Sequence, residues 1–318
     1  MGPAAVILWI VVVACAGWAC VRVLGLDRGF PVVPLFAYTP YVAVLAALVA
    51  ASALLVGRWI AAAIAVASTL ALVVAVLPRA LSGSDTVAEG GVELTVTSAN
   101  LALGEAEAAE LSAIVRERGT DLLSIQELTA GAARSLREAG IEASLPERVL
   151  AVGPESTGAG LYSRYPLRRL RRTSFGIAGV PMPQAEARVP GARRLEIAAV
   201  HPNPPIGPPE VDLWRESLRS IPPGSGGSPR ILAGDFNATL DHAEMRRVLD
   251  AGYRDAADAV GAGLVATWRS GHPFLPPLTI DHVLVGPGIE VREFEVDDLS
   301  DSDHRAVTAV VEIPAGVR

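Results

Sequence analysis

The sequence contains no lysine, so all 27 of its basic residues are arginine, set against 34 aspartates and glutamates. The net charge of −7 disfavours sequence-independent binding of nucleic acid, because such binding needs a basic protein surface that neutralises phosphates. Cysteine is scarce as well, and both copies, Cys15 and Cys20, lie in the first apolar segment. The rest of the chain therefore contains neither a disulfide nor a thiolate metal site.

The signatures of several common enzyme classes are also missing. The sequence has no HExxH zinc-protease motif, no P-loop of the form GxxxxGK followed by Ser or Thr, and no GxSxG hydrolase elbow. Aromatic residues make up only 5% of a chain that is 51% hydrophobic, so the apolar excess is aliphatic. This composition rules out a disordered protein and is too apolar for an ordinary soluble one.

Most of the aliphatic excess lies in three runs, residues 3–21, 41–56 and 60–77. Each run approaches the roughly 20 residues that cross about 30 Å of hydrocarbon as a helix. We therefore expect residues 1–81 to form a membrane region with about three transmembrane helices. Residues 82–91 are small, polar and glycine-rich, which predicts a linker, and residues 92–318 are expected to form the catalytic domain.

Two other interpretations of the first run are a cleaved signal peptide and a buried helical hairpin. The run lacks a basic leader and two more apolar runs follow it, so a spanning helix is favoured. With three crossings, Arg22, Arg28 and Arg79 share a side with the catalytic domain and Arg58 lies on the other. Taken alone, this positive-inside count favours a cytoplasmic catalytic domain by about two charges.

From residue 92, short β-rich runs alternate with helical stretches, which predicts an α/β domain whose strand ends line one site. Taken singly, the polar residues that close these runs have structural explanations, such as helix caps, turn formers or a buried histidine. Together they supply hard oxygen ligands for Mg²⁺ or Mn²⁺, a carboxylate to activate water and imidazoles to stabilise charge. This combination predicts metal-dependent hydrolysis of a phosphate ester or anhydride. The residues are Asn100, Glu127, His201, Asp235, Asn237, Asp281, Asp303 and His304.

The ordered series SAN, IQE, LYSRYPL, HP, GDFN, IDHV and SDH resembles the endonuclease/exonuclease/phosphatase superfamily of DNase I-like enzymes. The resemblance covers about residues 92–313 and implies a four-layer α/β/β/α sandwich. It also implies that Glu127 is the principal ligand of a Mg²⁺ or Mn²⁺ ion, with Asn100 and Asp303 nearby. Many relatives carry Asp or Asn at the position of Ala102, so a single-ion site is expected here.

The resemblance implies the catalytic roles as well. Asp235 matches the residue that orients or deprotonates water, and Asn237 the one that holds the phosphate. His304, with Asp281 holding its imidazole, matches the group that stabilises the transition state. His201 matches the histidine that DNase-like members place beside the scissile phosphate.

Further residues are candidates for substrate contact. Arg164 belongs to the family motif LYSRYPL, and Asn203 is a weaker candidate in HPNPP. Trp268, Phe274 and Leu275 precede the IDHV motif and are candidates for an apolar lip that receives a lipid tail, although ordinary loop packing is the slightly favoured explanation.

The combination of three apolar segments with this domain is similar to the VanJ-type glycopeptide-resistance membrane proteins. That resemblance implies a multi-pass cell-membrane protein with an extracytoplasmic catalytic domain, and it outweighs the arginine count. It also implies that the partners are the lipid bilayer and a phosphorylated, polyprenyl-linked envelope intermediate, with no stable nucleic-acid partner. A membrane-tethered Mg²⁺-dependent nuclease is the alternative, and a catalytically silent scaffold of the same fold is the third hypothesis.

Overall fold

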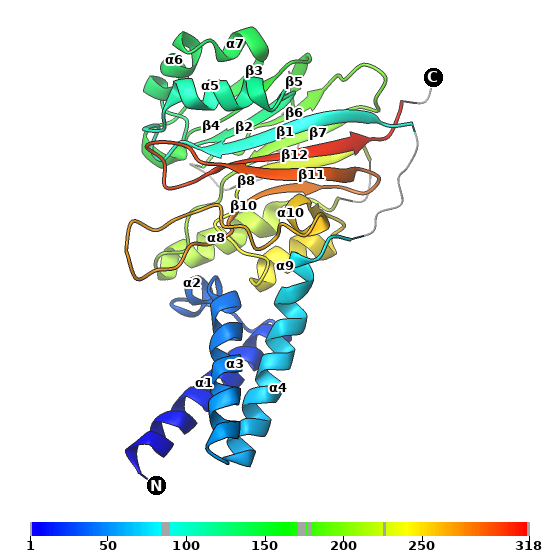
Figure 1. The fold of residues 1–318 in the computed structure, drawn as a ribbon. Helices are drawn as coiled ribbons and strands as arrows, with labels where there is room; N and C mark the ends of the chain where they lie inside the picture. The colour runs from blue at the N-terminus through cyan, green and yellow to red at the C-terminus, as the bar shows by residue number, and fades with distance from the viewer. Residues whose placement is uncertain (1, 84–89, 171–175, 177–179, 225–226, 317–318) are drawn as a thin grey trace.

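Apolar helices at the N-terminus form a stalk beneath an α/β body in the computed structural model, which describes residues 2–83, 90–170, 176, 180–224 and 227–316 (Figure 1). The helices are α1 (Pro3–Leu24), α3 (Thr39–Leu55) and α4 (Trp59–Val76), and the short α2 (Val32–Phe36) joins the first two. Two helices, α1 and the continuous helical segment Trp59–Ala80, are long and apolar enough to cross a membrane. The third, α3, has only 17 residues, so the expected number of about three spanning helices is not confirmed.

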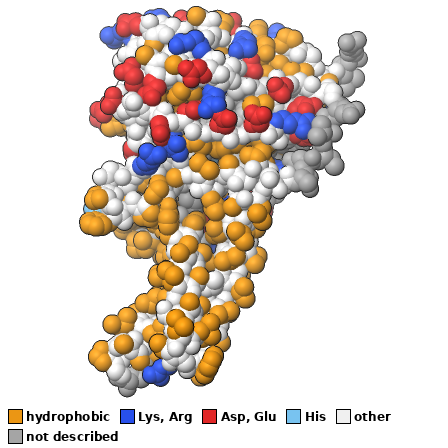
Figure 2. Space-filling model, viewed as in Figure 1, with side chains coloured by type: hydrophobic (Ala, Val, Ile, Leu, Met, Phe, Trp, Pro, Cys, Tyr) orange, Lys and Arg blue, Asp and Glu red, His pale blue; other side chains and the backbone are white. Residues whose placement is uncertain are grey.

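Small side chains let the stalk helices pack closely. Ala50 and Ala53 of α3 are buried in one cluster with Ala61, Ala62 and Ala65 of α4. Close approach through small residues is typical of helix pairs in membranes, where van der Waals packing replaces the hydrophobic effect. On the side that Figure 2 shows, hydrophobic side chains cover most of the stalk, whereas most charged side chains lie on the body.

The body contains two mixed β-sheets, each with six strands among the described residues. The first sheet has the order β11 (Glu290–Asp297), β12 (Ala306–Ile313), β1 (Val92–Asn100), β2 (Leu122–Gln126), β4 (Ala159–Ser163) and β3 (Glu147–Ala151). The second has the order β5 (Leu167–Arg169), β6 (Gln184–Ala187), β7 (Leu195–Val200), β8 (Arg230–Asp235), β10 (Asp281–Val285) and β9 (Arg254–Asp255).

The two sheets pack face to face, and helices cover their outer faces (Figure 1). Alternation along β1 shows why: Leu94 and Val96 point into the core between the sheets, whereas Ala99 points to the outer helices. The first sheet is covered by α5 (Ala108–Glu117), α6 (Ala130–Glu138) and α7 (Ile141–Ser144), and the second by α8 (Pro208–Ser220) and α9 (Ala243–Asp250). Short helical turns, η1 (Leu77–Ala80), η2 (Glu155–Thr157) and α10 (Ala256–Ala259), complete the described elements. The predicted four-layer α/β/β/α sandwich is confirmed.

Strand ends from both sheets converge at one edge of the sandwich. In the first sheet, β1 and β2 are parallel neighbours, with Asn100 opposite Gln126. In the second, β8 ends at Asp235, directly opposite Asp281 at the start of its antiparallel neighbour β10. The parallel pair β7 and β8 approaches so closely that a Cβ added at Gly234 would lie 1.9 Å from the Val200 carbonyl oxygen.

Buried polar contacts join the stalk to the body. Asp241 accepts two hydrogen bonds from Arg79 at 2.8 Å and one from Arg22 at 2.9 Å. Asp27 accepts from the Ala243 amide at the start of α9. We call this set of Arg22, Asp27, Arg79 and Asp241 the polar clamp. Two of the arginines used in the topology count are therefore internal partners of the body rather than free surface charges.

The predicted linker begins against the body. Gly83 donates its amide to the Ala259 carbonyl, and Ser82 forms a bridge with Val260. Residues 84–89 lie outside the described part of the chain, and Gly91 is again held, by the Glu312 carboxylate.

Candidate active site

A pocket of about 580 Å³ lies where the strands of both sheets end. Its walls include most of the predicted site residues, namely Glu127, His201, Asp235, Asn237, Asp303 and His304. The remaining two, Asn100 and Asp281, are buried directly behind these side chains and hydrogen-bonded to them. The sequence segments that carry the motifs, up to 204 residues apart, thus meet in one place.

Asn100 connects the two halves of the site. Its Nδ2 donates to Glu127 Oε1 at 3.3 Å and to Asp235 Oδ2 at 3.1 Å, and it lies 3.5 Å from His304 Nε2. Its Oδ1 accepts from the Ala102 amide. His201 closes the opposite side, with Nε2 at 3.7 Å from both Glu127 Oε1 and Asp235 Oδ2. Fully buried at the end of β1, the Asn100 amide fixes the spacing of the two carboxylates.

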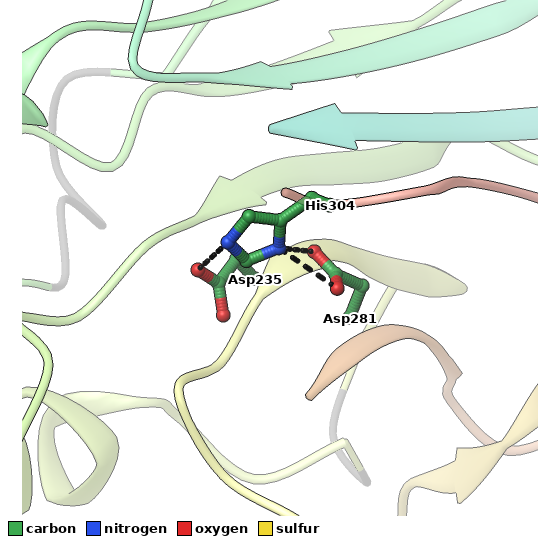
Figure 3. A group of neighbouring side chains, drawn as sticks. All are labelled: Asp235, Asp281 and His304. Atoms are coloured by element: carbon green, nitrogen blue, oxygen red, sulfur yellow. Dashed lines mark hydrogen bonds and ion pairs between the residues drawn. The ribbon is translucent and has the colours of Figure 1, made fainter. Parts of the chain in front are cut away.

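Asp281, His304 and Asp235 form a row (Figure 3). His304 Nδ1 lies 3.0 Å from both Asp281 carboxylate oxygens, and its Nε2 lies 3.7 Å from Asp235 Oδ2. Thr267 donates its hydroxyl to Asp281 Oδ2 at 2.6 Å. Asp281 therefore holds the imidazole with Nε2 turned toward Asp235 and the pocket, which is the orienting role that the sequence assigned to it.

Burial and neighbouring charges give the three titrating groups different protonation states. Burial raises the pKa of Asp235 to about 7, although the charge of His304 opposes this. Burial lowers the pKa of His304, but the carboxylates of Asp281 and Asp235 outweigh it and raise the pKa to about 10. Burial lowers the pKa of His201 to about 4 despite nearby Glu127. Near neutral pH, His304 is therefore a cation, His201 is neutral, and Asp235 can take up or release a proton.

The backbone is strained around the pocket. Among the described residues, six non-glycine residues have positive φ, and four of them line this pocket: Ala102, Leu103, Glu127 and Asn237. At Glu127 (φ 58°) the unusual backbone turns the carboxylate inward, where Oε2 accepts from the Leu103 amide. At Asn237 (φ 47°) the backbone N–H donates to Asp235 Oδ1 at 2.7 Å, and the side-chain Nδ2 donates to the Pro202 carbonyl. Such conformations are costly and are typical of functional sites.

Two predicted substrate contacts lie elsewhere. Arg164 pairs with Asp121 at 3.1 Å and lies at the far end of β4, outside the pocket. Because β4 runs antiparallel to β2, residues that follow Ser163 lie beside the beginning of β2 and not beside Glu127 at its end. Arg164 therefore does not line the pocket that the other predicted residues form. Asn203 follows His201 but is not among the described residues that line the pocket, and its buried Oδ1 has no hydrogen-bond partner within the described part of the chain.

One wall of the pocket and one positioning residue were not predicted from the sequence. Pro34, Ala37 and Tyr38, from the segment between α1 and α3, line the pocket although they precede the catalytic domain. Only the docking of the stalk brings them there, so no local pattern pointed to them. Thr267 was not predicted as a site residue either, because its contact with Asp281 requires tertiary structure.

A family model described as "Endonuclease/Exonuclease/phosphatase family" matches residues 97–304, which include the whole of this constellation. The chain belongs to this family. Members of the endonuclease/exonuclease/phosphatase family are hydrolytic phosphoesterases that use divalent metals. No curated protein sequence matches the chain significantly.

Solved structures agree with the family fold. The chain is similar to an endonuclease/exonuclease/phosphatase protein from Beutenbergia cavernae, with 18% identity, a TM-score of 0.57, and coverage of 70% of this chain and 72% of the other. It is also similar to the 3′ phosphatase NExo from Neisseria, determined with a product DNA hairpin (18%, TM-score 0.52, 68% and 98%). Truncated TDP2 from Caenorhabditis elegans is a third relative (17%, TM-score 0.54, 69% and 98%). At these identities the likeness shows the fold alone.

The donor set fits the divalent metal that family members use. Glu105, Glu127, Asp235 and Asp303 all line the pocket, and none of the described lining residues is arginine or lysine. A phosphate would be repelled by these carboxylates unless a cation bound between them, and hard carboxylate oxygens suit Mg²⁺ or Mn²⁺. The fit also explains why so many acids gather in a pocket for an anionic substrate.

Two different groups of side chains can be considered as the metal ligands. Ligand atoms of Asp235, Asp281 and His304 lie within 4.8 Å of one another. However, Asp281 already accepts hydrogen bonds from His304 and Thr267. Glu127 Oε1 accepts one hydrogen bond, from Asn100, and Asp303 Oδ1 lies 3.9 Å from His304 Nε2. Glu127 and Asp303, with Asn100 beside them, are the residues that would hold the ion, as the family resemblance implies.

Proposed function

We propose that the chain is a membrane-anchored, divalent-metal-dependent phosphoesterase that hydrolyses a phosphate or pyrophosphate group on a lipid-linked envelope intermediate. The catalytic domain would lie outside the cytoplasm, with the stalk in the cell membrane. The proposal combines the family's chemistry with the position of the pocket beside the apolar helices. The resemblance of the sequence to VanJ-type proteins agrees with it.

The observation that carries the proposal is the wall contributed by the stalk. Pro34, Ala37 and Tyr38 border the pocket, and their place in the chain is between two apolar helices. Exposed hydrophobic side chains also border it: Leu103 is 52% exposed and Ile206 is 72% exposed. A pocket with apolar borders next to a membrane segment suits a phosphate carried on a hydrocarbon. A duplex needs several cationic contacts along its backbone, and among the described lining residues His304 is the one cation.

The chain's own residues divide the hydrolytic work. Asp235, with a pKa near 7, accepts the proton of the attacking water and is held in place by the Asn237 amide and the Asn100 side chain. The His304 cation, held by Asp281, faces the pocket through Nε2 and stabilises negative charge that develops on the phosphoryl oxygens. A divalent ion, when bound, supplies further charge stabilisation and polarises the phosphoryl group.

The proposal is tested with the full-length protein in lipid nanodiscs. Inorganic phosphate released from a long-chain prenyl diphosphate is measured with Mg²⁺ and with EDTA. In a parallel reaction, plasmid DNA is tested as the substrate that the alternative nuclease function would require. We expect metal-dependent phosphate release that Glu127→Gln and His304→Ala reduce by at least 100-fold. Arg164→Ala is the matched control, because Arg164 lies outside the pocket, and it should retain wild-type activity. Degradation of DNA without phosphate release from the lipid would favour the nuclease.

The side of the membrane is a separate question. A reporter that is active only outside the cytoplasm, fused after Arg318, should be active in cells. An inactive reporter, with activity from the matched cytoplasmic reporter, would reverse the proposed topology without affecting the chemistry.

A further inference from the structure

A second pocket lies between the stalk and the body and has not been assigned a role. It has a volume of about 480 Å³ and runs along one face of α3, formed by Tyr41, Val44 and Leu48, with the end of α4 opposite. On the body side it is closed by the segments around Leu240, Leu264 and residues 277–279. We call this pocket the stalk groove.

The stalk groove is open on its outer side and apolar. Val44 is 60% exposed, Leu48 62% and Leu77 51%. The polar groups on its border are already engaged. Tyr41 donates its hydroxyl to the Pro277 carbonyl at 2.6 Å, and Thr279 donates to the Val265 carbonyl. A ligand here therefore gains from burial of hydrocarbon and not from new hydrogen bonds.

The stalk groove adjoins the active-site pocket. Ala37 and Leu278 line both pockets, and they pack together in one small buried cluster with Ile280. This cluster is a low apolar ridge between the phosphate-binding end and the groove. Trp268 and Tyr38 flank the ridge. A molecule with a phosphate at one end and a hydrocarbon at the other matches the order of these surfaces.

We propose that the stalk groove binds the hydrocarbon chain of a single-chain lipid phosphate whose head group occupies the active site, and that the chain enters from the bilayer between α3 and the body. This inference rests on the proposed function, which requires a lipid-linked substrate. Apolar side chains that remain exposed on a membrane helix face lipid, so the groove opens into the solvent from which such a chain comes. At roughly 30 Å³ for a group the size of water, the groove holds on the order of fifteen methylene groups, which suits part of one chain.

The first test fills the groove. Leu48→Trp places an indole in the groove, and Leu45→Trp is the matched control, because Leu45 is an exposed leucine on the same helix that does not line it. Burial of each methylene tightens binding roughly fourfold. In nanodiscs, Leu48→Trp should lower kcat/KM for a long-chain prenyl diphosphate by tenfold or more, because it raises KM for that substrate. It should leave kcat/KM for a five-carbon prenyl diphosphate within about twofold. Leu45→Trp should change neither.

Equal effects of Leu48→Trp and Leu45→Trp on the long-chain substrate would overturn the inference. So would wild-type hydrolysis of a diacyl phosphatidic acid at the same kcat/KM as the long-chain prenyl diphosphate, because the groove has room for part of one chain only.

The second test does not depend on turnover. The full-length protein in nanodiscs is irradiated with a long-chain alkyl phosphate that carries a diazirine near the middle of its chain, and labelled peptides are identified by mass spectrometry. We expect labels on the α3 segment that contains Val44 and Leu48, competed by unlabelled prenyl diphosphate and reduced at least fivefold by Leu48→Trp. Labels spread evenly over α1, α3 and α4 would overturn the inference even if the enzyme hydrolyses lipid phosphates. Competed labelling of the groove without any hydrolysis would instead uphold the groove and refute the proposed function.

Discussion

Replacement of Asp281 by asparagine tests the role of the row formed by Asp281, His304 and Asp235. The change keeps the size of the side chain and one oxygen for Thr267, but it removes the negative charge that lies 3.0 Å from His304 Nδ1. A rise in the His304 pKa from 6.5 to about 10 corresponds to roughly 5 kcal/mol in favour of the imidazolium, at about 1.4 kcal/mol for each tenfold in proton affinity. This net rise is what remains after the opposing effect of burial, and Asp281 is the first of the carboxylates that raise the pKa of His304. A single opposite charge at such a distance shifts a pKa by roughly one to three units.

The expected result is a change in both rate and pH profile. Wild-type activity should rise as Asp235 loses its proton near pH 7 and fall as His304 loses its proton near pH 10. In Asp281→Asn the basic limb should move to lower pH by roughly one to three units, and kcat at pH 8 should fall by about 10² to 10⁴-fold, the range typical of a lost acid–base group. The measurement is phosphate release from pH 5.5 to 10.5.

Thr267→Val is the control for a purely structural effect. It removes a hydrogen bond to Asp281 but leaves the charge in place, so it should slow the reaction by about tenfold or less and leave the basic limb where it is. The reasoning is refuted if Asp281→Asn retains wild-type kcat, or if it loses activity while its basic limb matches that of the wild type.

Three further predictions concern the metal, the stalk and the sheet. Mg²⁺ at about 100 times its Kd should stabilise the folded protein by about 2.7 kcal/mol, seen as a higher Tm, and Glu127→Gln should abolish that rise; an identical rise in the variant would exclude Glu127 as a ligand. Asp241→Ala leaves its buried arginine partners unpaired, so it should lower the free energy of unfolding of the full-length protein in detergent by about 3–5 kcal/mol. The control Asp212→Ala, at an exposed pair, should change that free energy by less than about 0.5 kcal/mol. Burial opposes ionisation of Asp241 but its arginines outweigh this and lower its pKa, so its contribution should persist above pH 3.8 and disappear as the pH falls through the lower folded value. Gly234→Ala should lower the Tm and the yield of folded protein, because its methyl group would meet the Val200 carbonyl; a wild-type Tm would show that β7 and β8 can separate freely.

Much of the site could be predicted because its residues sit where strands end. Asn100 and Glu127 follow parallel neighbouring strands, so their side chains meet once the two strands pair. Asp235 and Asp281 meet because the end of one strand lies opposite the start of its antiparallel neighbour. In both cases the sequence already shows a polar residue at the end of an apolar run, which predicts a side chain at that end of the strand. The fold class follows from the same alternation of strands and helices.

The misassigned and missed residues have a different origin. Arg164 lies in a family motif, but the motif does not reveal that β4 runs antiparallel to β2, which places the residues after Ser163 away from the pocket. Ala37 and Tyr38 reach the pocket because the stalk is docked on the body, where Asp27 and Asp241 are among the groups that join the two. Contacts of this kind join residues more than 150 positions apart through buried charges, and no periodicity in the sequence reports them.

The pocket wall that the stalk contributes has a practical consequence for work with shortened forms of the protein. A fragment that begins at Val92 retains every strand and every acidic group of the pocket, yet it lacks Ala37, Tyr38 and the Val33 carbonyl that bonds His242. Such a fragment has a cleft open to water on one side. We expect such a fragment to accept bulky soluble esters more readily than the complete protein does, so its substrate range would describe the truncation.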